Sequence, residues 1–472
     1  MPSGKAVAET QSRVDGDNWL AATLILGSVM NPINTTTMAV ALTPIGIAFG
    51  ASPAETAWLV SVFYLSTAVG QPVAGRLVDT VGARRTFLAA SSVIAIAGAL
   101  GTFAPSLWFL VGTRVLLALG TSAAYPAAMS VIRSESDAVG DSRQRALLTA
   151  LAMSNQALAA VGPVVGGVLL STGSWQPVFA INVPLALVCI GLGAWRIPRS
   201  QGGEPTTWRQ LDPAGAILFT VSLVALMLCL MQPDRLLAYA APVALAAGIA
   251  LVVVERRATE PFLDVRLLAT DRPLTLTFLR QALSLSASFC YVYGFTQWLD
   301  DVRGFGATTT GLMVAPLFVV SVLVSAILVR SRAIRARLVS GAVCSLAAGI
   351  VVLTMRDESP LALVISVSVL LGIAQGLNGP ALQLSVFTQS RRERIGTSAG
   401  LLRTSGYLGA MVSAGAVAAC FADAATLHGL HRLSLFMLGA SALLLVVSLL
   451  DPAIRRPVHA KRNPEGAGAA VT

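Results

Sequence analysis

Long apolar stretches alternate with short polar segments along the whole chain. A helix needs roughly 20 residues to cross a hydrocarbon core of about 30 Å, and fourteen stretches have close to that length. The pattern therefore predicts an all-α integral membrane protein with fourteen transmembrane helices. The predicted spans are residues 19–45, 57–74, 86–103, 107–129, 146–170, 177–195, 213–231, 236–254, 273–299, 308–329, 338–355, 360–387, 397–421 and 433–450.

Basic residues are distributed unequally between the two sides of these spans. If the N-terminus is inside, the tails and inward loops hold 26 of the 33 lysines and arginines, and the outward loops hold four. The remaining three, Arg114, Arg280 and Arg403, lie within spans. An excess of positive charge on one side is typical of cytoplasmic loops. We therefore expect a multi-pass protein of the inner or plasma membrane with both termini cytoplasmic.

The composition narrows the possible classes of function. The chain is 55% hydrophobic and 12% charged, and its mean hydropathy is +0.74, so we do not expect a soluble enzyme or a catalytic site. The net charge of +10 is spread over short loops, where orientation and anionic lipids account for it, so no nucleic-acid partner is expected. The five cysteines show neither disulfide nor metal-binding spacing. We expect no cofactor, no metal and a monomer in contact with membrane lipids.

The loop between the second and third spans resembles a signature of the major facilitator superfamily. The residues that carry this resemblance are Gly75, Asp79, Gly82, Arg84 and Arg85. Thr80 and Ala83 stand where the family usually has basic residues. The resemblance implies a conformational role for this inward loop, in which the glycines allow a tight turn and the aspartate holds arginines and a helix end.

A second motif lies in the fifth span, at Gly162, Pro163, Gly166 and Gly167. It resembles the antiporter motif of drug exporters in the same superfamily, although Leu158 stands where those proteins commonly have glycine. Glycines one turn apart leave a groove for a partner helix, and a proline removes a backbone donor and bends the span. Plain helix packing would explain the glycines alone. The exporter pattern continues after them with Trp175, Phe179, Asn182 and Pro184.

The number of spans, fourteen rather than twelve, resembles the drug:proton antiporter branch of this superfamily, the multidrug efflux type. This resemblance implies a major facilitator fold with two six-helix bundles, residues 19–195 and 273–450. Two inserted helices would lie within residues 196–272, and cytoplasmic tails would be residues 1–18 and 451–472. Transporters of this kind rock two bundles about a cavity near the middle of the membrane.

Polar residues inside spans are candidates for lining that cavity, because an unpaired polar group facing lipid is costly. Asn31 and Asn34 lie on one face of the first span. An interhelical hydrogen bond is the alternative role for each candidate taken singly. The substrate-cavity candidates are Asn31, Asn34, Tyr64, Gln71, Tyr125, Asn155, Gln156, Gln281, Tyr291, Tyr293, Gln297, Gln375 and Asn378.

The three arginines within spans receive different interpretations. Arg114 matches the membrane arginine of the family, which implies that it assists proton movement, although Leu117 and Ala118 replace the family's usual Gln and Gly. Arg280 and Arg403 lie near the inward ends of their spans, where arginine can extend toward lipid headgroups. We interpret these two as anchors, with anion binding as the alternative.

Acidic residues are absent from the middle of every predicted span. Asn34 stands where related antiporters carry an aspartate, and its amide cannot titrate. The candidates for proton coupling are therefore Arg114, Asp79, Glu55, Asp300 and Asp301. Proton exchange is the leading hypothesis, and a facilitator driven by the substrate gradient is the alternative.

Together these observations predict a secondary transporter that exports amphipathic or lipophilic small molecules such as drugs, antibiotics or endogenous metabolites. Without a buried carboxylate to offset a cation, the cavity favours neutral or weakly anionic compounds. A lipid or metabolite exporter of the same fold, an uptake carrier and a membrane scaffold or sensor that moves no solute remain alternatives.

Overall fold

The computed structural model describes residues 4–139, 154, 158, 161–197, 212–231, 233–258, 265–328, 333–390, 395–422 and 424–454. Within these residues the regular structure is entirely helical. The elements are α1 (Gly4–Phe49), α2 (Pro53–Val81), α3 (Ala83–Thr102), α4 (Leu107–Val139), the helical stretch Val161–Leu170, α6 (Pro177–Ala180), α7 (Asn182–Arg196), α8 (Pro213–Met231), α9 (Pro233–Glu255), α10 (Val265–Thr270), α11 (Arg272–Phe289), η2 (Cys290–Phe295), α12 (Thr296–Asp301), α13 (Ala307–Ile327), α14 (Ile334–Leu353), α15 (Leu361–Gln389), α16 (Ile395–Phe421), α17 (Leu427–Leu450) and η4 (Pro452–Ile454).

Ten helices in the described part of the chain are long and apolar enough to cross a membrane, judged by length and composition. Three shorter apolar helices coincide with other predicted spans: Val161–Leu170, Ala214–Leu230 and Tyr239–Glu255. The predicted ninth span corresponds to α11, the π-helix η2 and α12 in succession. The all-α membrane architecture is confirmed, whereas the number fourteen stays a prediction because residues 140–153 are among those not described.

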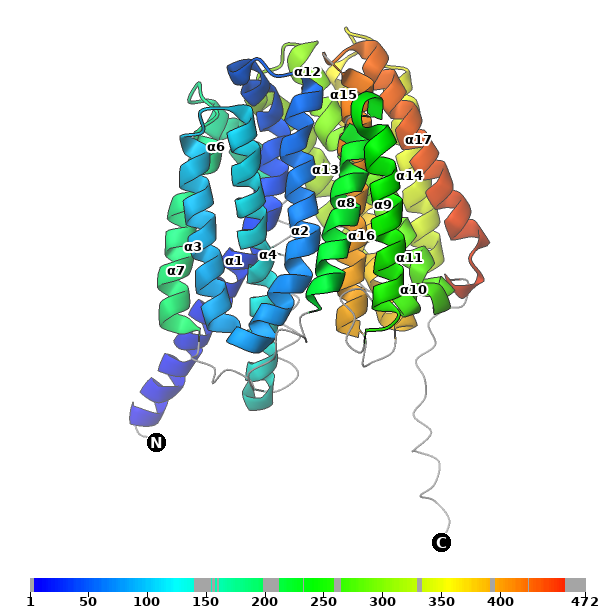
Figure 1. Ribbon diagram of the computed structural model, residues 1–472. Coiled ribbons are helices and arrows are strands. Elements are labelled where there is room, and N and C mark those ends of the chain that lie inside the picture. The colour runs from blue at the N-terminus through cyan, green and yellow to red at the C-terminus, as the bar shows by residue number, and fades with distance from the viewer. Residues whose placement is uncertain are drawn as a thin grey trace.

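The helices pack as two groups, which we call the N-half (residues 4–197) and the C-half (residues 265–454). Within the N-half, α3 packs on α4 and α7, and α1 packs on α4 and α7. Within the C-half, α14 packs on α15 and α17, while α11 packs on α16 and α17. Figure 1 shows the blue and cyan N-half beside the yellow and orange C-half. Helix α2 joins the halves by packing against both α4 and α16.

The pair α8 and α9 belongs to neither half. These helices pack against each other, and α8 also contacts α2 of the N-half and α16 of the C-half. In Figure 1 the two green helices stand in front of the boundary between the halves. The inserted pair therefore covers one side of the interface between the halves.

Local sequence explains where several of these helices begin. Ser52 and Glu55 form a capping box at the start of α2, in which each side chain accepts a hydrogen bond from the other residue's backbone N–H. Asp271 caps α11 by accepting from the backbone N–H of Leu274 at 3.2 Å. Gly82 separates α2 from α3 with a φ of 95°, a conformation that glycine adopts at little cost.

Arg280 has a different environment from the one that the sequence predicted. Its side chain is 0% exposed, and its Nη2 lies 2.6 Å from Asp451 Oδ2 and donates to the carbonyl oxygen of Val447 at 3.0 Å. The interpretation of Arg280 as a headgroup anchor is therefore wrong. The carboxylate that pairs with it lies 171 residues away in the chain, and the fold brings the two residues together inside the C-half.

Candidate functional site

Two side chains of α2 form hydrogen bonds across the boundary between the N-half and the C-half. The hydroxyl groups of Tyr64 on α2 and Tyr293 on η2 lie 2.9 Å apart. Two turns further along α2, Gln71 Nε2 donates to the hydroxyl oxygen of Tyr407 on α16 at 2.7 Å. We call these four residues the seam. Three of them, Tyr64, Gln71 and Tyr293, were predicted as cavity candidates, and the fold brings them together.

Aromatic rings surround the seam. The ring centroid of Tyr64 lies 5.4 Å from that of Phe289 and 5.9 Å from that of Tyr407. The rings of Phe289 and Tyr293 stack at 5.4 Å. These separations are within the range that aromatic pairs prefer. The contacts form an apolar, polarizable wall with hydroxyl and amide groups at its edges.

Tyr291 faces a different way from Tyr293, although both lie in the π-helix. The Tyr291 hydroxyl is hydrogen-bonded to Ser368 on α15, and Ser368 Oγ donates to the carbonyl oxygen of Met313 at 2.6 Å. Short π-helical segments often occur at functional sites. Here the segment presents Tyr293 to the N-half, while Tyr291 stays within the C-half.

Arg114 is held between helices of the N-half. Its side chain is 2% exposed, and its Nε donates to the carbonyl oxygen of Leu59 at 3.2 Å. Its Nη1 donates to the carbonyl oxygen of Asn34 at 3.4 Å, and its guanidinium carbon lies 4.2 Å from the ring centroid of Phe63. Within the described part of the chain its charge is balanced by carbonyl dipoles and an aromatic face.

Several cavity candidates join helices within one half. Asn34 is 6% exposed and donates to Asn182 Oδ1 at 2.6 Å, which links α1 to α7. Asn31 Nδ2 donates to Thr121 Oγ1 at 3.1 Å. In the C-half, Asn378 Nδ2 donates to Ser284 Oγ at 3.1 Å. These three candidates have the interhelical hydrogen bonds that were the alternative interpretation; these bonds do not test a role in binding.

The other cavity candidates divide between buried and half-buried positions. Gln297 is 2% exposed, and neither polar atom of its side chain has a hydrogen-bond partner among the described residues. Gln375 Oε1 is likewise buried without such a partner. Gln281 and Tyr125 are half-buried. Asn155 and Gln156 lie outside the described residues.

Arg403 reaches across the interface instead of toward lipid headgroups. It lies on α16, and its guanidinium carbon is 3.6 Å from the ring centroid of Tyr125 on α4 of the N-half. The anchor interpretation is therefore wrong for Arg403 as well.

Tyr407 and Phe289 were not among the predicted site residues. A signal for Tyr407 was present, because it follows Arg403 by four residues and so shares its helical face.

The loop that carries the family signature makes the turn that its glycine predicts. Gly82 has positive φ. Gly75 is not closely packed, because a Cβ added there would meet nothing within 4 Å. The guanidinium of Arg84 donates to the carbonyl oxygen of Ala194 at the end of α7. Arg85 is exposed. The side chain of Asp79 lies outside the described part, so its predicted role is not tested.

The glycine motif of the fifth span makes contacts on two faces. A Cβ at Gly162 would lie 2.9 Å from Thr36 Cβ, and one at Gly166 would lie 3.0 Å from the carbonyl oxygen of Thr37, both on α1. The other face meets the C-half: a Cβ at Gly167 would lie 2.7 Å from Thr308 Cα. Small residues permit this approach of backbones.

Pro163 belongs to the same second face. A Cβ at Gly311 on α13 would lie 2.5 Å from the carbonyl oxygen of Pro163, and Thr308 Oγ1 donates to the carbonyl oxygen of Gly167 at 2.9 Å. The motif thus contacts α1 within the N-half on one face and α13 of the C-half on the other. Plain packing within one bundle does not account for the second set of contacts.

The halves also meet at the end of the molecule that was predicted to face outward. The backbone N–H of Ala54 donates to the carbonyl oxygen of Ala422 at 3.3 Å. Asp301, which follows the ninth predicted span, is hydrogen-bonded to Thr43 of α1. This end is therefore closed by contacts between the N-half and the C-half.

Among the acidic candidates at this end, Asp300 is the most perturbed. Burial raises the pKa of Asp300 to about 7, a hydrogen bond from Thr310 lowers it, and neighbouring Asp301 raises it. The Thr310 hydroxyl donates to Asp300 Oδ1 at 3.0 Å. Burial also raises the pKa of Asp301. Glu55, the remaining candidate here, is engaged in the capping box of α2.

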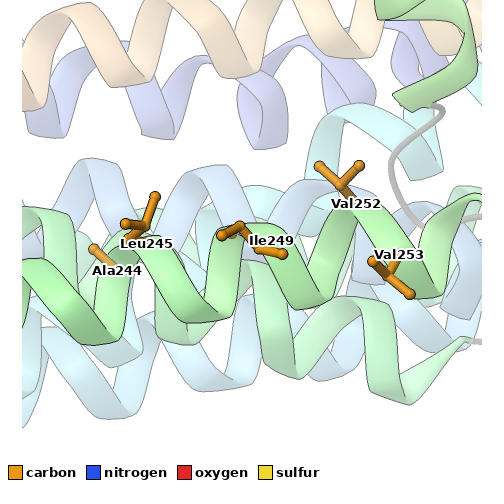
Figure 2. Close-up of a pocket in the computed structure, with 6 residues that line it drawn as sticks. Ala244, Leu245, Ile249, Val252 and Val253 are labelled. Carbon is orange, nitrogen blue, oxygen red and sulfur yellow. The ribbon is translucent and has the colours of Figure 1, made fainter.

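A separate apolar pocket lies on α9. Its lining residues are Ala244, Leu245, Gly248, Ile249, Val252 and Val253. Figure 2 shows the labelled side chains along one helix of the inserted pair. The pocket offers no polar side chain, so it lacks the groups that fix the orientation of a bound molecule.

Sequence and structure comparisons agree with this architecture. The sequence model of the Major Facilitator Superfamily matches residues 24–414. YwoD of Bacillus subtilis, described as an uncharacterized MFS-type transporter, is 30% identical over 89% of this chain and 94% of its own length. The multidrug efflux pump LfrA of Mycolicibacterium smegmatis is 29% identical over 85% of this chain and 81% of its own length.

Solved structures match with lower identity. The crystal structure of a peptide transporter, POT, in complex with sulfate superposes with a TM-score of 0.69 at 14% identity, covering 91% of this chain and 93% of that one. Two packed helical halves joined across a polar and aromatic seam, with these matches, define a multi-pass membrane transporter. The chain belongs to the Major Facilitator Superfamily.

Proposed function

We propose that this protein exports amphipathic or lipophilic small molecules by alternating access. The observation that carries the proposal is the seam, where Tyr64 and Gln71 of the N-half bond to Tyr293 and Tyr407 of the C-half. A site shared by two halves changes its exposure when the halves move relative to each other. Its aromatic wall suits an apolar body, and its hydroxyl and amide groups suit a polar end.

The contacts at the predicted outer end suggest how such a movement would proceed. The Ala54–Ala422 and Thr308–Gly167 hydrogen bonds hold this end closed. We propose that these contacts break when the protein opens outward, and that Gly162, Pro163, Gly166 and Gly167 form the packing surface for the movement. At the inward end, the signature residues Gly75, Asp79, Gly82, Arg84 and Arg85 would stabilise the alternative closure.

Export is favoured over uptake by two features. The glycine motif of the fifth span resembles that of drug exporters, and LfrA, 29% identical, is named a multidrug efflux pump. Drugs, antibiotics and endogenous lipophilic metabolites are the substrate classes that we propose for this chain.

We further propose exchange with protons, with Asp300 as the leading titratable group. Its pKa of about 7 allows its charge to change near neutral pH. The next residue, Asp301, is hydrogen-bonded to Thr43 on α1 of the N-half. Separation of the halves would therefore change the surroundings of Asp300 and link its protonation to the conformation. Arg114 would act through the backbone of α1, because it contacts the carbonyl oxygen of Asn34. A facilitator without proton exchange is the second candidate, since no acid lies near the middle of the described spans.

The direct test is solute flux in proteoliposomes that contain only the purified protein. A neutral lipophilic dye should move faster than in protein-free liposomes. A proton gradient directed into the liposomes, with the outside acidic, should accelerate efflux of the dye. A flux that ignores the pH gradient would select the facilitator. Flux equal to that of protein-free liposomes across a chemically diverse panel would overturn transport and favour a scaffold.

We propose a monomer in the plasma membrane with both termini cytoplasmic.

A further inference from the structure

Besides Arg114, which interacts electrostatically with Tyr64 and Tyr293, a second positive charge lies near the seam and faces the opposite half. Arg403 is half-buried on α16, and its guanidinium carbon lies 3.6 Å from the ring centroid of Tyr125 on α4. An arginine that anchored a helix to headgroups would extend toward the membrane surface. Arg403 instead places its charge at the boundary between the halves.

The other two arginines within spans are already engaged. Arg280 forms an ion pair with Asp451 at 2.6 Å, and Arg114 donates to two backbone carbonyl oxygens. In the described part of the chain, by contrast, no carboxylate is paired with Arg403, and the predicted spans contain no aspartate or glutamate near their middle. A half-buried guanidinium without a counter-ion attracts an anion.

Hydrogen-bond donors lie next to this charge. Tyr407 follows Arg403 by one helical turn and accepts a hydrogen bond from Gln71, which leaves its own O–H free to donate. Gln281 Nε2 lies 3.2 Å from the position of a Cβ added at Gly406, so the Gln281 amide packs against the same turn of α16. The charge and these donors come from two helices, α16 and α11.

We propose that this site selects amphipathic organic anions, with Arg403 as the residue that determines the preference. The guanidinium would bind a carboxylate through two parallel hydrogen bonds, and the Gln281 amide and the Tyr407 hydroxyl would donate to the same group. The aromatic body would pack on Tyr64 and Phe289. Lipophilic cations are disfavoured because the site offers them a like charge. This proposal rests on the proposed export function and names its substrate class.

Three coumarin derivatives with the same aromatic body test this preference. One carries a carboxylate, one the corresponding carboxamide and one an aminomethyl group that is a cation at neutral pH. Initial rates are measured with purified protein in proteoliposomes, and the rates in protein-free liposomes are subtracted. We expect the carboxylate to be transported with a kcat/KM at least about tenfold above that of the amide, the factor expected for a charge-assisted hydrogen bond. The cation should be the poorest substrate.

Substitution of Arg403 isolates the origin of the preference. Arg403→Gln should lose the preference, so that the ratio of kcat/KM for the carboxylate to kcat/KM for the amide falls to about one. Arg403→Lys keeps the charge but not the paired geometry, so it should retain a reduced preference. Arg356→Gln is the matched control, because Arg356 is exposed in a loop and its loss changes the net charge equally.

The outcomes separate this proposal from the export function. Wild-type protein that moves the carboxylate and the amide equally, or Arg403→Gln protein that keeps the preference, overturns the proposal and leaves export intact. If Arg403→Gln moves neither compound, Arg403→Lys decides: a retained preference supports the proposal and equal rates overturn it. Wild-type protein that moves none of the three compounds overturns this proposal, and the flux of the neutral lipophilic dye then tests the export function separately.

Discussion

The hydroxyl groups of Tyr64 and Tyr293 lie 2.9 Å apart, although 229 positions separate the two residues in the chain. One residue belongs to the N-half and the other to the C-half, and each ring also packs against Phe289. Movement of the halves about this contact would have to break or rearrange the hydrogen bond. The pair therefore connects the structure of the seam to the proposed transport cycle.

The Tyr64–Tyr293 hydrogen bond should contribute to the arrangement seen here. We expect the Tyr64→Phe and Tyr293→Phe substitutions to be non-additive in thermal stability, with a coupling free energy of about 1 kcal/mol, because each removes the same bond. The measurement is a double-mutant cycle on the purified protein in detergent. Stability changes that add within about 0.3 kcal/mol would show that the hydroxyl groups do not interact.

Gly167 should control closure of the predicted outer end. A Cβ added there would lie 2.7 Å from Thr308 Cα, and backbone atoms cannot yield as a flexible side chain can. Gly167→Ala should therefore shift the protein toward conformations in which this end is open. The measurement is the distance between spin labels at Ala51 and Ala424, which lie on different halves and should become farther apart in the variant.

A matched glycine substitution tests whether this effect is specific. A Cβ at Gly191 on α7 would meet nothing within 4 Å, so Gly191→Ala should leave the label distances unchanged. Equal distance distributions in the Gly167→Ala and Gly191→Ala variants would show that the contact between Gly167 and α13 does not govern closure.

Protonation of Asp300 should favour the closed outer end. The pKa of Asp300 is about 7 in this arrangement, above the value of about 3.9 for an exposed aspartate, because burial disfavours the charged form. The stabilisation of the closed end is thus fully present below about pH 4, declines as the pH rises and is lost above about pH 7. The population of the long label distance between Ala51 and Ala424 should increase over this window.

The Asp300→Asn variant should lose that pH dependence. Asp357, an exposed acid in another loop, provides the matched control, and Asp357→Asn should keep the dependence of the wild-type protein. A pH response in Asp300→Asn as large as in the wild type would assign the titration to another group.

The residue at position 34 should influence which charge the protein transports. Asn34 Nδ2 donates to Asn182 Oδ1 and to the carbonyl oxygen of Met30, and an ionised carboxylate at this position could donate to neither. Asn34→Asp should therefore lower the free energy of unfolding by about 1–3 kcal/mol and should gain transport of an organic cation such as ethidium. Asn34→Ala serves as the control, because it loses the same bonds without adding charge. A folded Asn34→Asp variant with no gain in cation transport would contradict the role assigned to this position.

The helical architecture was predictable because its signals are local. Apolar length marked the spans, and the predicted starts at Leu107, Pro177 and Pro213 coincide with the starts of α4, α6 and α8. Gly82 was predicted to allow a tight turn, and its positive φ confirms this. Hydropathy did not predict the π-helix Cys290–Phe295, because a change of helical type leaves the apolar composition of a span unchanged.

The candidate site was predictable in its residue types but not in its pairings. Tyr64 and Tyr293 were selected separately as polar residues within spans, and only the packing of the halves places them together. Arg280 and Arg403 occupy similar depths in their spans, so the same role was predicted for both. Asp451 pairs with Arg280 whereas Tyr125 faces Arg403, and this difference depends on contacts between distant segments.

The most direct measurement of alternating access joins the two halves at the closed end. The backbone N–H of Ala54 and the carbonyl oxygen of Ala422 are 3.3 Å apart, so cysteines at these two positions should form a disulfide when the five native cysteines are replaced. Oxidation of the Ala54→Cys/Ala422→Cys protein in proteoliposomes should reduce flux of a neutral lipophilic dye to the level of protein-free liposomes, and a reductant should restore it. Each single-cysteine variant should be unaffected by the same oxidant. Undiminished flux through fully cross-linked protein would contradict transport by relative movement of the two halves.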